Sequence, residues 1–356
     1  MIENETGMIS SVGALGVDVQ RSDERAYWTY QYGPVSELHE LVEGFEMLKE
    51  VSDHEDRSRA VFRSLINGEV LREAAQTDDT ILDDIEIAFQ LEGTRTDDLW
   101  LIGLAKNRED RVPLHSVENI IRETDLTSSR ARAEGVVELY APVFPNFDLQ
   151  TNIRDAQISD LHELWGNTFG WTREGIVALQ NTLHAQDGVD PNDRQTWFSG
   201  ISDRATGKLV SAATAERLQF RESDGSPISL VENTEWAVHP SMRRRGLNAA
   251  TIAFLNGQVF TDLSDFPTIV AECNFGSRSD IPAYKAGFSI PEREYSGRTF
   301  QQVLEQNVVV NDGEMSDGLL RDFTLNVVRK AESDALYPRA LTALMVNAVR
   351  SQEGAK

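Results

Sequence analysis

The stretch that decides the fold is TEWAVHPSMRRRGLNAATIAFLNGQV, which runs from Thr234 to Val259. Its first residues have strand propensity, and His239-Pro240 ends that run. A helical pattern begins at Asn248 and gives this helix one apolar face. The apolar residues that recur with helical spacing are Ile252, Leu255 and Val259.

Between the strand and the helix lies a turn that contains Arg243, Arg244, Arg245 and Gly246. A helix N-terminus carries unpaired N–H groups and the positive end of the helix dipole, so it attracts anions. Glycine lets the backbone approach an anion closely, and arginines add charge and paired donors. A second strand is predicted from 268 to 273, which makes the unit a strand–helix–strand crossover. The turn is therefore either a pyrophosphate site or an exposed arginine cluster beside a helix end.

Two motifs in this half of the chain follow one another in a fixed order. The first joins Val238-His239-Pro240 to the run 243–248, and the second is Tyr284-Lys285-Ala286-Gly287-Phe288. Together they resemble the acetyl-CoA-binding core of the GNAT acetyltransferases, whose motifs are V-x-P, [Q/R]-x-x-G-x-[G/A] and Y-x-x-G-F. Asn248 departs from the pattern by replacing the last small residue, but Asn also tolerates positive φ. The resemblance covers residues 149–310 and implies an α+β fold with a mixed, mostly antiparallel sheet flanked by helices.

The resemblance implies acetyl-CoA as co-substrate and no metal. Tyr284 is the implied general acid for the departing CoA thiolate, and Asn274 is implied to bind the pantetheine arm. Backbone N–H groups near Ala237 or Val238 are implied to polarise the thioester carbonyl. The implied cofactor-binding residues are Val238, Arg243, Arg244, Arg245, Gly246, Leu247, Asn248, Ala249 and Asn274.

Acetyl transfer to an amine needs a base, because the ammonium form must lose a proton before its nitrogen can attack. Glu232 and Glu235, on the predicted central strand, are the candidate bases. Strict alternation of side chains puts them on opposite faces, so at most one faces the substrate. On this pattern Glu235 shares a face with Ala237 and is our first choice. Some family members have their carboxylate at the position of Glu232, so both stay open.

The run from Glu232 to Ala237, followed by Pro240, is also similar to the E-x-T-[D/E]-[aromatic]-A pattern of archaeal β-lysine N-acetyltransferases. This similarity implies a small amine or amino acid as acceptor. Direct transfer in a ternary complex is the expected route, since the sequence shows no activated nucleophile. Two alternatives remain. One is a non-catalytic acyl-CoA-binding or interaction protein on a decayed GNAT fold, and the other is a protein N-terminal or lysine acetyltransferase.

The charge balance of the chain is strongly acidic. Its net charge is −24, with a pI near 4.6, and six lysines occur against 28 arginines. The acidic residues are spread along the sequence, which indicates either a halophilic source or a mesophilic protein with an acidic surface for cationic substrates. This balance argues against nucleic-acid binding. No apolar run approaches the length of a membrane span and no secretory signal is visible, which favours a cytoplasmic protein.

Three regions are expected along the chain. Residues 1–145 are predicted to form a smaller accessory α+β domain of unknown role, or a degenerate copy of the same fold. Residues 146–330 contain the GNAT-like acetyl-CoA-binding domain. Residues 331–356 are predicted as an amphipathic helix that packs either on the N-terminal region or on a second copy of the chain, giving a homodimer.

The remaining elements follow from periodicity, length and breakers. Helices are expected over 36–51, 55–76, 80–90, 158–165 and 172–184, and the segments 117–124 and 132–138 complete the α+β region. Strands are expected over 26–32, 98–105, 148–154, 197–201, 209–218 and 320–328. The strands 197–201 and 209–218 form a hairpin in this interpretation, with Thr214, Glu216 and Arg217 toward its far end.

Overall fold

The structure is a computed structural model of the whole chain. The residues that it describes are 9–10, 18–22, 25–29, 33–54, 59–70, 73, 85–91, 94, 98–107, 146–263, 268–274, 282–283, 286, 288, 294–295, 298–299 and 323–329. The chain divides into two compact units. The first combines 1–120, 219–228 and 291–324, and the second combines 121–218, 229–290 and 325–356. No helix among the described residues is both long and apolar enough to cross a membrane.

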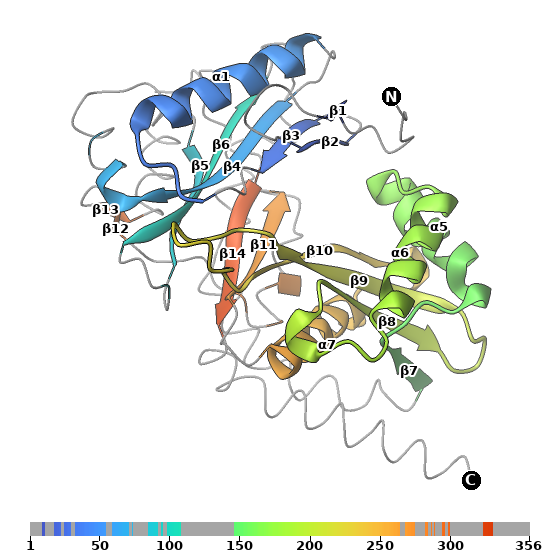
Figure 1. Cartoon of the computed structure of the whole chain (residues 1–356). Helices are drawn as coiled ribbons and strands as arrows, with labels where there is room; N and C mark the ends of the chain where they lie inside the picture. Colours follow the sequence, from blue (N-terminus) through green and yellow to red (C-terminus); the bar gives the residue numbers. More distant parts are fainter. Residues whose placement is uncertain are drawn as a thin grey trace. The chain divides into compact units, whose positions relative to one another are not determined.

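The first unit is built on a six-stranded sheet in the order β1-β2-β3-β4-β6-β5. Only β3 and β4 pair in parallel, and the other neighbours are antiparallel. The strands are β1 Ile9–Ser10, β2 Asp18–Ser22, β3 Arg25–Thr29, β4 Arg59–Asn67, β5 Ile85–Gln90 and β6 Leu99–Asn107. Helix α1, Leu38–His54, packs against β3 and β4, and its buried residues include Leu41, Phe45 and Leu48 (Figure 1). It confirms the helix predicted over 36–51.

Two predicted helices in this unit are wrong. The expected helix over 55–76 is the strand β4 from Arg59 to Asn67, and the end of the expected helix over 80–90 is the strand β5. In β4 the adjacent residues Val61 and Phe62 are both buried, as are Leu65 and Ile66. A strand buried on both faces shows a continuous apolar run, which periodicity alone cannot distinguish from a buried helix.

The second unit contains a six-stranded sheet in the order β14-β11-β10-β9-β8-β7. The pairs from β7 to β10 are antiparallel, whereas β10 and β11 are parallel. The sheet is therefore mixed and mostly antiparallel, as expected. Its strands are β7 Phe147–Gln150, β8 Thr196–Asp203, β9 Leu209–Leu218, β10 Leu230–Val238, β11 Thr268–Asn274 and β14 Phe323–Arg329. A separate two-stranded sheet pairs β12 Glu294–Tyr295 with β13 Arg298–Thr299.

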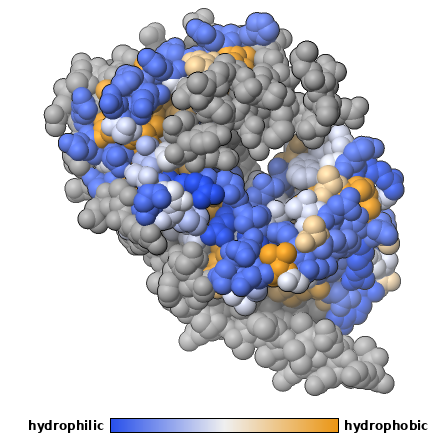
Figure 2. Space-filling view, in the orientation of Figure 1, coloured by the Kyte–Doolittle hydropathy of each residue, from blue (hydrophilic) through white to orange (hydrophobic). Residues whose placement is uncertain are grey.

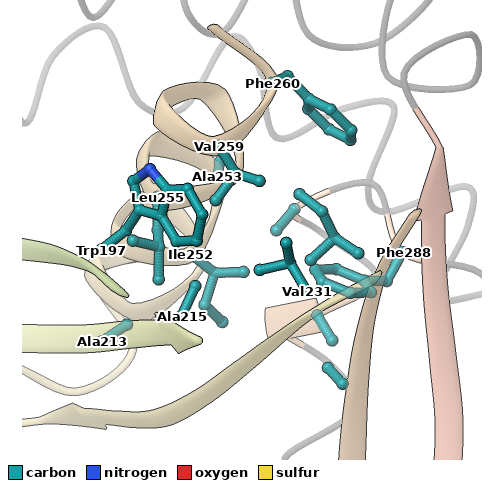
Figure 3. Packing of buried hydrophobic residues seen from close by; sticks show 14 of the residues in the cluster. Trp197, Ala213, Ala215, Val231, Ile252, Ala253, Leu255, Val259, Phe260 and Phe288 are labelled. Atoms are coloured by element: carbon teal, nitrogen blue, oxygen red, sulfur yellow. The ribbon is translucent and has the colours of Figure 1, made fainter. Parts of the chain in front are cut away.

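Helices cover both faces of the sheet in the second unit (Figure 1). On one face, α5 (Ile158–Phe169) and α6 (Arg173–Ala185) pack on Phe198, Ala212 and Ala237. On the other face, α7 (Leu247–Asp262) packs on Trp197, Ala213, Ala215 and Val231 through its residues Ile252, Leu255 and Val259 (Figure 3). Short 3-10 helices lie at η4 Asp155–Gln157, η5 Pro191–Asp193 and η6 Pro240–Met242.

Local sequence signals fix the start of α6, as predicted, and the end of α5, which lies four residues beyond the predicted end at Trp165. Thr172 caps α6, because its hydroxyl accepts a hydrogen bond from the Gly175 N–H. Gly170 ends α5 in the left-handed conformation at φ 74°. Hydrophilic residues predominate among the coloured residues on the face shown in Figure 2. The segments 117–124 and 132–138 and the helix predicted over 331–356 lie outside the described residues.

Candidate active site

The two parallel strands at the centre of the second unit separate part of the way along their length. Pairs join Leu230, Val231 and Glu232 of β10 to 268–270 of β11. Strand β10 continues to Val238 and β11 to Asn274, and no pair follows between the described residues of these two strands. The separation leaves backbone groups of both strands available to a ligand at their carboxyl ends.

A β-bulge lies on β10 beside this separation. The register between β10 and β9 shifts between Thr234 and Ala237. Glu235 occupies the extra position with φ 55°, which is in the left-handed region where a non-glycine residue is strained. Strained backbone of this kind is concentrated at functional sites. Strict alternation predicted that Glu232 and Glu235 lie on opposite faces of the sheet. That argument is wrong, because the bulge interrupts the alternation between these two residues.

Residues beyond the bulge return to a regular arrangement. Ala237 packs with the cluster under α5 and α6, whereas Trp236 packs with the cluster on α7. Trp236 also meets the ring of Phe288 at a centroid distance of 6.3 Å. Phe288 is the last residue of the second predicted motif, so this motif contacts β10 two residues before the first motif begins.

Glu232 lies opposite Glu216 in the register of β10 and β9. Burial of the Glu216 carboxyl, although part of its side chain is exposed, raises its pKa, and the charge of Glu232 raises that pKa further. The sequence had placed Glu216 toward the far end of a hairpin, but it gave no signal that two carboxylates would face each other. Strand pairing brings them together.

The helix that follows β10 begins at a turn suited to an anion. Gly246 has φ 77° and precedes α7, and no side chain caps the helix. Arg243, Arg244 and Arg245 are exposed beside it. Arg244 is itself left-handed, with φ 63°. Uncapped N–H groups with exposed guanidinium groups around them fit a pyrophosphate, so the predicted residues of this turn do come together.

The predicted cofactor residues inside α7 are mostly buried in the protein. Leu247 and Ala249 are buried, Asn248 is half-buried, and these residues offer an anion their backbone N–H groups. Val238, at the end of β10, is partly buried and packs against the hydrophobic cluster that contains Leu247 and Ala249. His239, between β10 and η6, has its Nδ1 atom 2.8 Å from Ser241 Oγ and its Nε2 atom 3.3 Å from Glu163 Oε1 of α5.

A buried polar network that sequence reasoning missed fixes the start of α7 on the sheet. Thr251 Oγ1 donates to the Leu247 carbonyl at 2.9 Å and lies 2.7 Å from Ser211 Oγ of β9. Ser211 Oγ also lies 3.1 Å from the Ala237 carbonyl oxygen, so its single hydroxyl proton is shared between this oxygen and Thr251 Oγ1. Ser199 Oγ donates to the Thr251 carbonyl at 3.1 Å. Ser199, Ser211 and Thr251 lie among apolar residues in the sequence, and no local pattern there predicts that they bond to one another across the sheet and helix.

The side chains of two predicted site residues, Tyr284 and Asn274, are not among those that the structure describes. Tyr284 lies outside the described residues. Asn274 ends β11, and only its backbone is described. Within the described part of the chain, no group of three or more His, Cys, Asp or Glu residues is arranged to hold a metal ion.

Of the comparisons with known proteins, only the one with solved structures found matches. No protein-family model matches the chain, and no curated protein matches it either. A solved structure from Desulfovibrio desulfuricans, described as belonging to the GNAT family of acetyltransferases, matches with 13% identity and a TM-score of 0.32, over 51% of this chain and 98% of that one.

Two further solved structures have names that state an acceptor. Ribosomal-protein-S5-alanine acetyltransferase from Vibrio fischeri matches with 10% identity and a TM-score of 0.35, over 52% of this chain and 93% of that one. Glucosamine-6-phosphate N-acetyltransferase from Arabidopsis thaliana matches with 14% identity and a TM-score of 0.30, over 42% and 96%. The similarity to β-lysine acetyltransferases stays a prediction. The three solved structures named here are thus described as acetyltransferases, and the first of them as a member of the GNAT family.

Proposed function

We propose that this protein is an N-acetyltransferase that transfers an acetyl group from acetyl-CoA directly to a small amine or amino acid in a ternary complex. The observation that carries the proposal is the separation of β10 from β11 after Glu232, next to an uncapped helix start with three exposed arginines. The separated strands offer unpaired backbone groups that can bind a thioester and its pantetheine arm. The helix start offers an anion site for a pyrophosphate.

Acetyl-CoA would supply an activated acetyl group. Arg243, Arg244 and Arg245 would neutralise its pyrophosphate, while N–H groups from Leu247 to Ala249 would bind the phosphate oxygens at the helix start. The N–H groups near Ala237 and Val238 would donate to the acetyl carbonyl. Asn274, at the end of β11, would face the pantetheine arm across the opening.

The protein must also remove a proton from the acceptor amine. We assign this role to Glu235, because the bulge places it where the two strands part and its backbone is held in a strained conformation. Glu232 is the alternative base, three residues earlier on the same strand. Tyr284 is assigned as the proton donor to the departing thiolate by its position in the second motif.

The acidic composition, with a net charge of −24, favours a cationic acceptor. The same composition supports the proposal of a salt-adapted, cytoplasmic enzyme, which high-salt activity would test. The names of the structural neighbours mention different acceptors, so the acceptor of this chain must come from its own residues.

The decisive experiment is calorimetric titration of acetyl-CoA into the wild type and into Gly246→Glu, at low and high salt. The new carboxylate would stand where the pyrophosphate should lie, so binding is expected in the wild type and not in the variant. Gly188→Glu is the matched control, since Gly188 has a similar φ of 82°, open space around it, and a position after α6. This control should bind like the wild type.

Two results would overturn the proposal. Absence of acetyl-CoA binding by the wild type at both salt concentrations would mean that the arginine turn is only a surface feature. Equal binding by Gly246→Glu and the wild type would remove the turn from the site. Acetyl-CoA binding without thiol release across a library of amines would instead favour the non-catalytic acyl-CoA-binding protein.

A further inference from the structure

We propose that the first unit is a second copy of the fold of the second unit, and that the chain itself closes the cofactor groove of this copy. Each protein chain would then bind a single acetyl-CoA, in the second unit. The closing segment is 33–36, which precedes α1. This inference rests on the proposed function, which makes the second unit the copy that binds acetyl-CoA.

Five strands of each unit follow one another in the same order. They are β1-β2-β3-β4-β6 in the first sheet and β8-β9-β10-β11-β14 in the second. In both units the first three of these strands are antiparallel neighbours, and the third pairs in parallel with the fourth. One helix connects the two parallel strands in each unit, α1 in the first and α7 in the second. The two units therefore share a topology over these strands and the crossover helix.

The residues under the two crossover helices also match in position. In the first unit Trp28 of β3 pairs with Phe62 of β4. Both face α1, because a Cβ atom at Gly44 would lie 3.3 Å from the Phe62 ring and 3.7 Å from the Trp28 ring. In the second unit Val231 pairs with Ile269, and both belong to the cluster that α7 covers. These two pairs are equivalent and align the units residue by residue.

The next pair along is the last regular one between the described residues of the parallel strands in each unit. It joins Thr29 to Arg63 in the first unit and Glu232 to Val270 in the second. Thr29 therefore stands where the second unit has Glu232, one of the two candidate bases. A threonine hydroxyl stays protonated at neutral pH, so it cannot replace a carboxylate as the group that takes a proton from an ammonium ion.

The two units differ beyond this last pair. In the first unit the chain turns at Gly33, which has φ 122°, and returns to β4 at Val35. Val35 forms a parallel bridge with Ile66, and its N–H donates to the Leu65 carbonyl at 2.7 Å. Both Gly33 and Val35 are buried. The segment 33–36 thus continues a parallel pairing that the described residues of β10 and β11 do not continue.

Closure of this strand edge removes the feature on which the proposed cofactor site depends. In the second unit, the separated strands offer unpaired backbone groups to the pantetheine arm. In the first unit the Leu65 carbonyl, two residues beyond the last regular pair, already has a backbone partner. A pantetheine arm would have to displace a buried segment of the chain and break its hydrogen bond, which costs free energy.

The start of the crossover helix differs in charge between the units. Glu37 directly precedes α1, as Gly246 directly precedes α7. The Glu40 carboxylate, in the first turn of α1, accepts a hydrogen bond from the Ser36 N–H at 3.2 Å. No residue between β3 and α1 is an arginine or a lysine, whereas three arginines precede α7. Carboxylates at a helix start interact favourably with the helix dipole, but they repel a pyrophosphate.

The number of acetyl-CoA molecules bound per chain tests this inference directly. Equilibrium dialysis of the full chain against radiolabelled acetyl-CoA should give one molecule per chain at saturation. Glu37→Gly gives the first unit the residue that precedes α7, and it removes a carboxylate while the Val35 backbone stays paired. This variant should also bind one molecule per chain.

Hydrogen exchange of the full chain, followed by NMR, locates the bound molecule and tests the closure separately. Acetyl-CoA should slow exchange in 243–249 and leave exchange in 33–40 unchanged. Without acetyl-CoA, the Val35 amide should exchange at least about tenfold more slowly than the Gly207 amide, after correction for intrinsic rates. Gly207 is the matched reference, because its N–H makes a bond of the same length, 2.7 Å, to the Asp203 carbonyl in an exposed turn.

Several results would overturn the inference. They are two molecules bound per wild-type chain, a second molecule bound by Glu37→Gly, protection of 33–40 by acetyl-CoA, and a Val35 amide that exchanges as fast as that of Gly207. If the wild type binds no acetyl-CoA, the proposed function fails, and the exchange rate of Val35 alone decides whether the groove is closed. If two molecules bind, the acetyltransferase proposal stands and only the closed copy fails.

Discussion

Ser211 Oγ and Thr251 Oγ1 lie 2.7 Å apart in the interior of the second unit and join β9 to the first turns of α7. Because Ser211 Oγ also lies within hydrogen-bond distance of the Ala237 carbonyl oxygen, the same hydroxyl pair fixes β10 just after its bulge. These contacts therefore fix the position of β10, which we expect to bind the thioester, relative to α7, which we expect to bind the pyrophosphate. Both residues are fully buried, which makes their hydrogen bonds expensive to lose.

Replacement of Thr251 by valine should lower the free energy of unfolding by about 1 to 3 kcal/mol, because Ser211 then loses a buried partner. The affinity for acetyl-CoA should fall as well, since the start of α7 is less firmly positioned. Urea unfolding and calorimetry would measure the two effects. Thr182→Val is the matched control, because Thr182 makes the same kind of bond to a carbonyl four residues earlier, but on an exposed surface. Equal effects of both variants would contradict this prediction.

Asp262, at the end of α7, is expected to contribute strongly to stability. Its Oδ2 atom accepts from the indole N–H of buried Trp197 at 2.8 Å and from Arg194 at 2.7 Å. Asp262→Ala should therefore lower the free energy of unfolding by about 2 kcal/mol. The surface pair of Asp148 with Arg204 has a similar distance of 2.8 Å, yet Asp148→Ala should cost less than about 1 kcal/mol. Thermal unfolding of both variants would test whether Asp262→Ala lowers the free energy of unfolding more than Asp148→Ala does. A larger decrease for Asp148→Ala would contradict this prediction.

Asn233 of β10 and Asn256 of α7 should behave as a coupled pair. The Asn233 side-chain amide donates to Asn256 Oδ1 at 2.6 Å, and both residues are almost fully buried. Each alanine variant alone leaves a buried amide without its partner, so the double variant should cost less than the sum of the single ones. A double-mutant cycle in urea should give a coupling energy of about 0.5 to 3 kcal/mol. Strict additivity would mean that the contact contributes nothing.

Glu216 should make stability depend on pH with a defined sign. Its folded pKa is raised above the usual value of 4.5, so the folded state binds the proton more tightly than the unfolded state does. Its contribution is therefore most favourable below pH 4.5 and is lost as pH rises through the folded pKa. Glu216→Gln should raise the free energy of unfolding relative to wild type at neutral pH and change it little at the acidic end.

The measurement for this prediction is urea unfolding of wild type, Glu216→Gln and Glu174→Gln over a series of pH values. The difference between Glu216→Gln and wild type should grow as pH rises. A difference that is independent of pH, or one matched by the exposed control at Glu174, would show that the pair with Glu232 has no effect on stability.

Local signals in the sequence determined the elements that carry the proposed cofactor site. Strand propensity ended by His239-Pro240 predicts the end of β10, and apolar spacing after Gly246 predicts α7. Thr172 at the start of α6 is a further case, since a capping hydroxyl acts within one turn. Each of these features depends on neighbours close in the chain, which is why the sequence alone was sufficient.

Features that depend on distant neighbours were decided only by the tertiary structure. The apolar run around Phe62 suited a helix as well as a strand, and burial on both faces between β3 and β6 made it β4. Alternation predicted opposite faces for Glu232 and Glu235, but the bulge against β9 interrupts it. The opposition of Glu216 and Glu232 likewise arises from strand register. Register is set by the packing of whole sheet faces against helices, and no short stretch of sequence records that packing.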